Sequence, residues 1–148
     1  MTTITRTSAD NPDFQHLVKL LNADLAERDG EDHPLAQFNP VQHLKYVVMA
    51  YENNEPIACG AIAEYNPEVM EIKRMYVKPK ARGKRIGEKI LAELELWVKE
   101  LGNSSCVLFM GSKQPEAYKL YQRCGYQPVP KYGKLLEIED CLCFGKEI

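Results

Sequence analysis

The sequence predicts a single α/β domain, residues 1–148, in which helices flank one mixed β-sheet. Two observations predict this fold class. Segments with strand-like alternation and segments with helical apolar spacing follow one another in the order β-α-β-β-β-α-β-α-β-β. The chain also has the length of one domain, 148 residues of which 45% are hydrophobic, and no linker or repeat divides it.

The first half of the chain supplies one helix and most of the sheet. Residues 2–7 alternate weakly as a strand, and the cluster SADNPD that follows is typical of a helix cap. Apolar residues at helical spacing predict an amphipathic helix from Phe14 to Leu25, and a polar loop comes next. Residues 46–51 have the pattern of a strand and residues 53–55 that of a hairpin turn. The apolar run 57–63 predicts a central strand covered on both faces.

The next strand, residues 69–77, has an irregular pattern. Ile72 and Met75 are three residues apart, whereas Met75 and Val77 are two apart. If all three side chains point to one face, an extra residue near Lys73-Arg74 must form a β-bulge. Alternatively, Met75 faces another layer of the structure. The pattern by itself leaves both interpretations open.

The second half begins with a clear helix, whose apolar stripe starts at Ile86 and ends before Gly102. Residues 106–110 predict a short buried strand. Residues 115–125 predict a helix with proline in its first turn and glycine after its end. Residues 126–129 and 135–144 are expected to form the last two strands, around a turn that contains proline and glycine.

The composition excludes several classes of protein. No apolar run is long enough to cross a membrane, and the N-terminus lacks the pattern of a signal peptide, so we expect a cytoplasmic protein. The five cysteines lie mostly among apolar neighbours, which favours buried reduced thiols. Cys141 and Cys143 form a C-x-C pair without further ligands at zinc-like spacing. We therefore expect no metal, and both cysteines on one face of a strand.

Positive charge is concentrated between residues 73 and 89, which hold eight of the 19 basic residues and one acidic residue, Glu88. Nucleic-acid surfaces usually spread such charge over several elements, so we expect a compact anionic ligand and no nucleic acid. The segment ARGKRIG runs from a strand into a helix, whose free N–H groups attract phosphate. It matches neither a P-loop nor a dinucleotide-binding motif. The alternative is a solvated basic start of a helix.

Two motifs resemble those of the GNAT superfamily of N-acetyltransferases. The segment RGKRIG (82–87) is similar to the family's pyrophosphate loop R/Q-x-x-G-x-G/A, with Arg82 and Gly87 at its ends. Arg85 stands where the family has glycine, and we expect its backbone to need only helical angles and its side chain to point away. The segment QPEAYKLYQRCGY is similar to N-x-x-A-x-x-L-Y-x-x-x-G-F/Y, with Gln114 in place of asparagine. The order of elements is also the family's order.

The resemblance implies a mostly antiparallel sheet and acetyl-CoA as co-substrate. Acetyl-CoA would lie in a V-shaped opening between the strands 69–77 and 106–110. The strand 69–77 would pair with the pantetheine arm, the loop 82–87 would hold the pyrophosphate, and a backbone N–H near Met75 or Tyr76 would stabilise the oxyanion. The residues expected to bind the cofactor are Met75, Tyr76, Val77, Arg82, Gly83, Lys84, Arg85, Ile86, Gly87, Gln114 and Tyr121.

The resemblance also implies catalytic roles. Tyr121 matches the general acid that protonates the leaving thiolate, and Tyr118 is the rival that does not match the motif. Glu71 resembles the carboxylate base of some family members, or it pairs with a lysine or arginine. The function implied is transfer of acetyl from acetyl-CoA to a primary amine, on a small molecule or amino acid.

Three questions stay open at this stage. The alternatives to a small-molecule enzyme are a non-catalytic acyl-CoA sensor and a protein or peptide N-acetyltransferase. The acidic loop AERDGEDHPLAQF, which contains His33, could attract a cationic acceptor or could be a solvated loop. An exposed last strand could pair two subunits into a homodimer.

Overall fold

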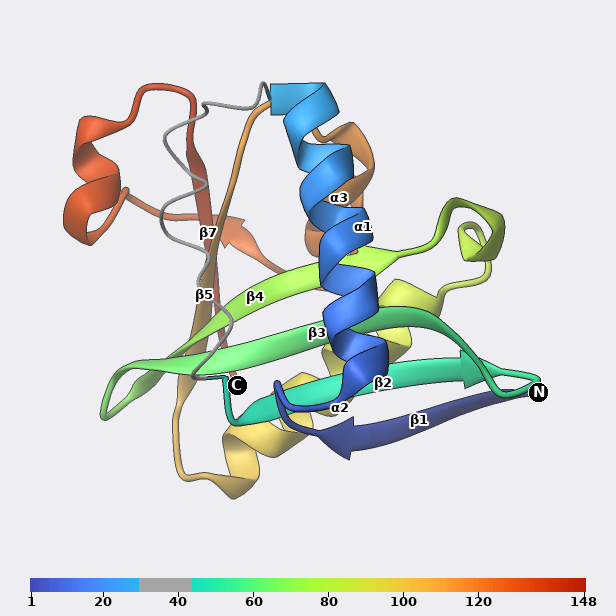
Figure 1. The fold of residues 1–148 in the computed structure, drawn as a ribbon. Coiled ribbons are helices and arrows are strands. Elements are labelled where there is room, and N and C mark those ends of the chain that lie inside the picture. The colour runs from blue at the N-terminus through green and yellow to red at the C-terminus, as the bar shows by residue number, and fades with distance from the viewer. Residues whose placement is uncertain (30–43) are drawn as a thin grey trace.

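The computed structural model describes residues 1–29 and 44–148, and it confirms the predicted order of elements. The helices and strands are shown in Figure 1. Their bounds are β1 (Thr2–Thr7), α1 (Pro12–Asp29), β2 (Tyr46–Glu52), β3 (Glu55–Asn66), β4 (Val69–Val77), the 3-10 helix η2 (Pro79–Ala81), α2 (Ile86–Glu100), β5 (Ser105–Met110), α3 (Pro115–Arg123), β6 (Gln127–Pro128), the 3-10 helix η3 (Gly133–Glu137) and β7 (Leu142–Glu147).

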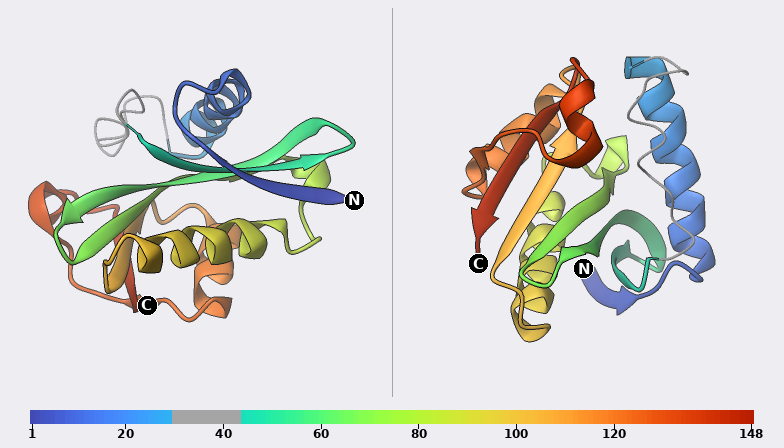
Figure 2. Two further views of the ribbon diagram at one scale, coloured as in Figure 1. Left: turned by 90° about the horizontal axis from the view of Figure 1, so that it is seen from below. Right: turned by 90° about the vertical axis from the view of Figure 1, so that its left-hand side faces the viewer.

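The strands form one seven-stranded sheet in the order β1-β2-β3-β4-β5-β7-β6. Every neighbouring pair is antiparallel except β4 and β5, which are parallel. The expected mixed, mostly antiparallel sheet is therefore confirmed. Helix α1 covers one face of the sheet, and α2 and α3 lie on the other (Figure 2). This arrangement gives the sheet a separate hydrophobic core on each face.

The larger core lies between the sheet and the helices α2 and α3, and includes Ile86, Ile90 and Leu94. The second core lies under α1, around Phe14 and Leu17. Residues 57–62 of β3 are all buried because the strand contributes side chains to both cores. The prediction of a central strand covered on both faces is confirmed.

The predicted hairpin turn joins β2 to β3. Asn53 and Asn54 have φ angles of 52° and 66°. Asparagine tolerates this left-handed conformation, and two consecutive residues of this kind match the twist of the flanking strands.

The predicted strand 135–144 is wrong over most of its length. Residues 133–137 form the 3-10 helix η3, and the strand β7 runs from Leu142 to Glu147. The buried residues Leu135 and Ile138 are three apart, which is the repeat of a 3-10 turn and not of a strand. They pack with Cys141 and Cys143 in a small separate cluster.

Strand β7 does not lie at the edge of the sheet, whereas the possible homodimer was expected to form through an exposed last strand. It pairs with β5 along its whole length and with the two-residue strand β6 on its other side. The five cysteines are free thiols, as predicted, and all except Cys124 are buried. No helix in the described ranges is both long and apolar enough to cross a membrane.

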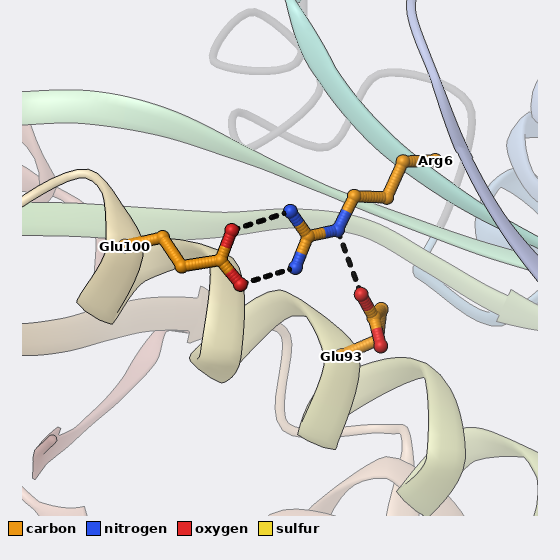
Figure 3. A network of polar contacts seen from close by, with 3 residues as sticks. All are labelled: Arg6, Glu93 and Glu100. Carbon is orange, nitrogen blue, oxygen red and sulfur yellow. Dashed lines mark hydrogen bonds and ion pairs between the residues drawn. The ribbon is translucent and has the colours of Figure 1, made fainter.

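An ion-pair network fastens the edge strand β1 to helix α2 (Figure 3). The Arg6 guanidinium donates from Nε to Glu93 at 2.7 Å, and from both terminal nitrogens to Glu100 at 2.8 and 2.9 Å. It also lies over the Trp97 ring, 4.6 Å from the ring centroid. Because the three charged side chains are partly exposed, solvent screens both pairs and we expect their contribution to stability to be small.

Candidate active site

A β-bulge in β4 shapes the site. Cys59 pairs with Tyr76 and Ala61 pairs with Lys73, so two residues of β4 lie opposite the single residue Gly60. Arg74, within the bulge, has a φ angle of 57°. Met75 therefore packs in the same core as Ile72, toward α2. The bulge that the spacing of apolar residues suggested is confirmed.

Gly60 makes room for the bulge. A Cβ atom at this position would lie 2.5 Å from Met75 Sδ, 2.8 Å from Ile90 Cγ2 and 2.9 Å from Leu94 Cδ1. Each distance is shorter than the van der Waals contact distance of the two atoms. The side chain of Met75 can point toward α2 because residue 60 has no side chain.

Beyond its first three residues, β4 separates from β5. The two strands pair at Val69–Glu71, and the register with β5 ends at Val107. Past this point a cavity of about 790 Å³ opens between β4, β5, α1, α3 and the loop before α2. Such a volume is typical of a ligand or cofactor site. The cavity lies where the V-shaped opening was expected.

Most of the residues predicted to bind the cofactor lie in the wall of this cavity. Those in the wall are Met75, Tyr76, Val77, Arg82, Gly83, Arg85, Ile86, Gly87, Gln114 and Tyr121. The exception is Lys84, whose ammonium nitrogen lies 3.7 Å from a carboxylate oxygen of Glu52. Phe109 and Met110 of β5 also line the cavity.

The loop before α2 exposes backbone donors. Arg82 donates from Nε to the Val77 carbonyl at 2.9 Å, and its guanidinium lies 6.0 Å from the centroid of the Tyr76 ring. Gly83 has a φ angle of 82°, a conformation that glycine adopts without steric cost. The first N–H groups of α2 have no partners within the helix. They carry the positive end of the helix dipole toward the cavity, which favours an anion there.

Arg85 departs from the expectation for its backbone. The predicted helical angles are wrong: the residue is the N-cap of α2 and has a left-handed conformation, with φ 60° and ψ 25°. A side chain in this conformation brings Cβ too close to the following carbonyl, which explains the glycine in the family's pattern. The Arg85 side chain is 81% exposed and lines the cavity, with Nη1 3.9 Å from Glu88 Oε2.

Gly87 allows α2 and α3 to approach each other. A Cβ atom at Gly87 would lie 3.1 Å from the Leu120 Cδ2 atom of α3. Two features of the structure therefore depend on residue 87. Its amide belongs to the exposed start of the helix, and its α-carbon lies in a close helix–helix contact.

Tyr121 is the buried tyrosine of α3. Its side chain lies in the cavity wall and makes a T-shaped contact with the ring of Tyr126, with 5.8 Å between centroids. Burial, with a smaller contribution from Cys124, raises the pKa of Tyr121 above its ordinary value. The phenol therefore stays protonated at neutral pH and can donate a proton. Tyr118 is 39% exposed and packs against Phe144, outside the cavity wall.

Glu71 lies beside the cavity and not in its wall. The Tyr132 hydroxyl donates to Glu71 Oε2 at 2.6 Å, and the Lys73 ammonium lies 3.0 Å from Oε1. The Lys73 ammonium also lies 5.3 Å from the Phe109 ring centroid, and Lys73 lines the cavity. Burial raises the pKa of Tyr132, and the negative charge of Glu71 raises it further. Of the two roles considered for Glu71, the ion-pair partner is the one that these contacts show.

Helix α1 contributes residues that the sequence analysis missed. Asn22, Asp24 and Arg28 line the cavity, together with Arg74 of the bulge. Arg28 forms ion pairs with Asp24, at 3.3 Å, and with Glu116 of α3. The pair with Glu116 joins α1 to α3. From residue 30 onward, the acidic loop and His33 lie outside the described residues. In the described ranges, no cluster of three histidine, cysteine, aspartate or glutamate side chains could hold a metal ion.

Comparisons with known proteins agree with this arrangement. Residues 14–126 match the model of the acetyltransferase (GNAT) family. An uncharacterised N-acetyltransferase of Schizosaccharomyces pombe is 28% identical over 131 residues, which cover 83% of this chain and 80% of the relative. A protein of Klebsiella pneumoniae described as an acyl-CoA N-acyltransferase has a similar crystal structure, with a TM-score of 0.84 and 28% identity over 99% of this chain and 97% of its own. A GNAT acetyltransferase of Elizabethkingia anophelis, solved with acetyl-CoA bound, has a TM-score of 0.69 and 22% identity over 99% of this chain and 98% of its own.

Proposed function

This chain belongs to the acetyltransferase (GNAT) family and is an acyltransferase, and we propose that it transfers the acetyl group of acetyl-CoA directly to a primary amine in a ternary complex. The observation that carries the proposal is one cavity that joins an anion-binding helix start, an unpaired stretch of β4 and the buried phenol of Tyr121. The structurally similar acetyltransferase of E. anophelis binds acetyl-CoA, which supports the same co-substrate here.

The start of α2 is the proposed site of the CoA diphosphate. The free N–H groups of the helix and the left-handed Gly83 present backbone donors. Arg82 and Arg85 line the same end of the cavity and add positive charge. The diphosphate would be held mainly by the backbone, with the side chains increasing the affinity.

The second half of β4 is the proposed site of the pantetheine arm. Past Glu71 the strand no longer pairs with β5, so the residues from Met75 to Val77 can bind an extended ligand as an added strand. The bulge changes the direction of the backbone at this point. A backbone N–H near Met75 or Tyr76 would then donate to the oxyanion that forms on the thioester carbonyl.

Tyr121 is the proposed general acid. The neutral amine attacks the thioester carbon, the attacking nitrogen loses a proton to water, the tetrahedral intermediate collapses, and the carbon–sulfur bond breaks to release the CoA thiolate. The Tyr121 hydroxyl gives its proton to that thiolate and is reprotonated from solvent. A phenol is protonated at neutral pH, so it can give its proton to a thiolate that forms within hydrogen-bond reach.

The acceptor must lose a proton before it attacks, and Glu71 is the proposed base. Lys73 connects Glu71 to the cavity, because it pairs with Glu71 and lines the wall. In this role Glu71 would exchange its bond to Lys73 or Tyr132 for a bond to the amine, directly or through water. A carboxylate that accepts a proton in this way returns it to solvent between turnovers.

The proposal is tested by incubating the protein with acetyl-CoA and a panel of small primary amines while free thiol is recorded. We expect thiol release that depends on both the protein and the amine, with the N-acetylated amine identified by mass spectrometry. Binding of CoA without thiol release from any amine would favour a non-catalytic acyl-CoA sensor. Tyr121→Phe separates the two, because a sensor does not need the phenol.

A further inference from the structure

Arg74 is a buried charge that has no counter-ion among the described residues. It is the one charged residue that is buried in the described part of the chain, with 5% of its surface exposed, and it lines the cavity. Its Nη2 donates to the Asn22 side-chain oxygen on α1. Its Nε atom is buried and has no hydrogen-bond partner. No carboxylate within the described ranges forms an ion pair with it.

Two other cations in the cavity wall, Lys73 and Arg28, do have acidic partners. Lys73 pairs with Glu71, and Arg28 pairs with Asp24 and Glu116. An arginine stays charged in a protein, and a buried guanidinium without an anion is strongly unfavourable. Burial indeed lowers the pKa of Arg74, but a guanidinium begins from too high a value to become neutral near pH 7. The unpaired donor therefore marks a place where an anion would be stabilised.

The backbone holds Arg74 in this place at a cost. Its φ angle of 57° is uncommon for a residue with a side chain, and such strain concentrates at functional sites. The bulge allows Arg74 to reach Asn22 on the α1 face of the sheet while Met75 packs toward α2. The strained residue is thus the one that carries the unpaired charge.

The position of Arg74 decides which anion it would meet. The proposed diphosphate site is formed by the start of α2, on the opposite face of the sheet from α1 (Figure 2). The part of the cavity between Arg74 and α1 is left for the acceptor. A carboxylate is planar and matches the fork formed by Nε and a terminal nitrogen of a guanidinium.

We infer that the acceptor is an amine that carries a carboxylate group, and that the Arg74 guanidinium binds this carboxylate. The inference rests on the proposed acetyl transfer and names the class of its acceptor. Asn22 acts as a positioning residue, because its side-chain oxygen accepts from Nη2 and holds the guanidinium in place.

The test compares matched acceptors. The 20 common amino acids and their decarboxylated amines are assayed with acetyl-CoA, and kcat/KM is measured for each pair that is acetylated. For the wild type we expect the amino acid to be preferred. In Arg74→Gln we expect this preference to fall by about 10- to 100-fold, the effect of losing a hydrogen bond to a charged group. Activity on the decarboxylated amine should fall less than activity on the parent amino acid.

Arg6→Gln is the matched control, because it also removes one guanidinium but lies outside the cavity wall. It should keep the wild-type preference. The inference is overturned if the wild type acetylates decarboxylated amines as well as their parent amino acids, or if Arg74→Gln retains the preference. Arg74→Gln should fold, since it removes a buried unpaired charge, and its melting temperature is measured to confirm this.

A binding measurement separates this inference from the proposed reaction. If no amine of either set is acetylated, the proposed function fails, and N-acetylated amino acids are tested as ligands in the presence of CoA. A rise in the melting temperature of the wild type, absent with the corresponding amides and absent in Arg74→Gln, supports a carboxylate site at Arg74. No rise with any of these acids contradicts it.

Discussion

Gly60 and Met75 face each other across β3 and β4 so closely that a Cβ on Gly60 would lie 2.5 Å from the Met75 sulfur. This contact connects the interior of the sheet with the cavity. Met75 belongs to the stretch of β4 that is proposed to bind pantetheine, and its position depends on the absence of a side chain at residue 60.

Gly60→Ala should therefore damage stability and binding together. We expect the free energy of unfolding to fall by about 1–3 kcal/mol because the core is overpacked. The affinity for CoA should also fall, because Met75 must move. Urea unfolding and isothermal titration with CoA measure the two effects. Gly145→Ala is the control: its nearest contact would be 3.1 Å, to Val129, and it lies outside the cavity wall, so unchanged CoA affinity is expected.

Arg85→Gly should relieve the left-handed conformation at the start of α2. The conformation costs roughly 1–2 kcal/mol for a residue with a side chain, and glycine avoids this cost. Glycine also makes the unfolded chain more flexible, which cancels part of the gain in stability. Arg85→Ala removes the same charge but keeps the strain. We expect the glycine variant to be more stable than the alanine variant by up to about 1 kcal/mol in urea unfolding, and both to bind CoA more weakly. Equal stabilities of the two variants would contradict the assigned conformation.

Tyr121→Phe should lower kcat by at least about 100-fold while the affinity for CoA stays close to that of the wild type. The reason is that only the proton donor is lost, and the ring keeps its contact with Tyr126. Tyr118→Phe is the matched control and should keep its kcat, since Tyr118 lies outside the cavity wall. A normal rate in Tyr121→Phe would remove the phenol from the mechanism.

Alkaline pH should destabilise the fold through its buried tyrosines. Burial raises the pKa of Tyr121, Tyr126 and Tyr132 above the ordinary value of about 10. The folded state therefore binds these protons more tightly than the unfolded state does. The contribution is fully present below about pH 10 and is lost as the pH rises through the folded values. Urea unfolding between pH 8 and pH 11 should show a loss above pH 10 that is smaller in Tyr132→Phe. A flat profile in this range would contradict the burial of these hydroxyls.

Much of the fold could be predicted from the spacing of apolar residues along the sequence. Strands and helices with strong patterns lie where predicted, and the irregular spacing of Ile72, Met75 and Val77 indicated the bulge. The predicted strand 135–144 failed because four apolar residues there pack around a 3-10 turn, and their spacing does not repeat in twos throughout. Such a cluster depends on tertiary contacts that a local pattern does not contain.

The site was predictable where a motif defines backbone geometry and less so where side chains meet from distant elements. The residues of the loop 82–87 other than Lys84 line the cavity, and so does Tyr121. The contacts of Glu71 with Tyr132 join residues 61 positions apart, and those of Arg74 with Asn22 join residues 52 apart. Arg74 appeared in the sequence as one member of a basic run. Its burial follows from the bulge and from the packing of α1 on the sheet.

The most direct test of the proposed reaction is a crystal structure of the protein with CoA. We predict the diphosphate at the first N–H groups of α2, the pantetheine arm along Met75–Val77, and the sulfur within hydrogen-bond reach of the Tyr121 hydroxyl, about 3.5 Å or less for oxygen to sulfur. A diphosphate excluded from the loop by the Arg85 side chain, or a sulfur remote from Tyr121, would contradict the account.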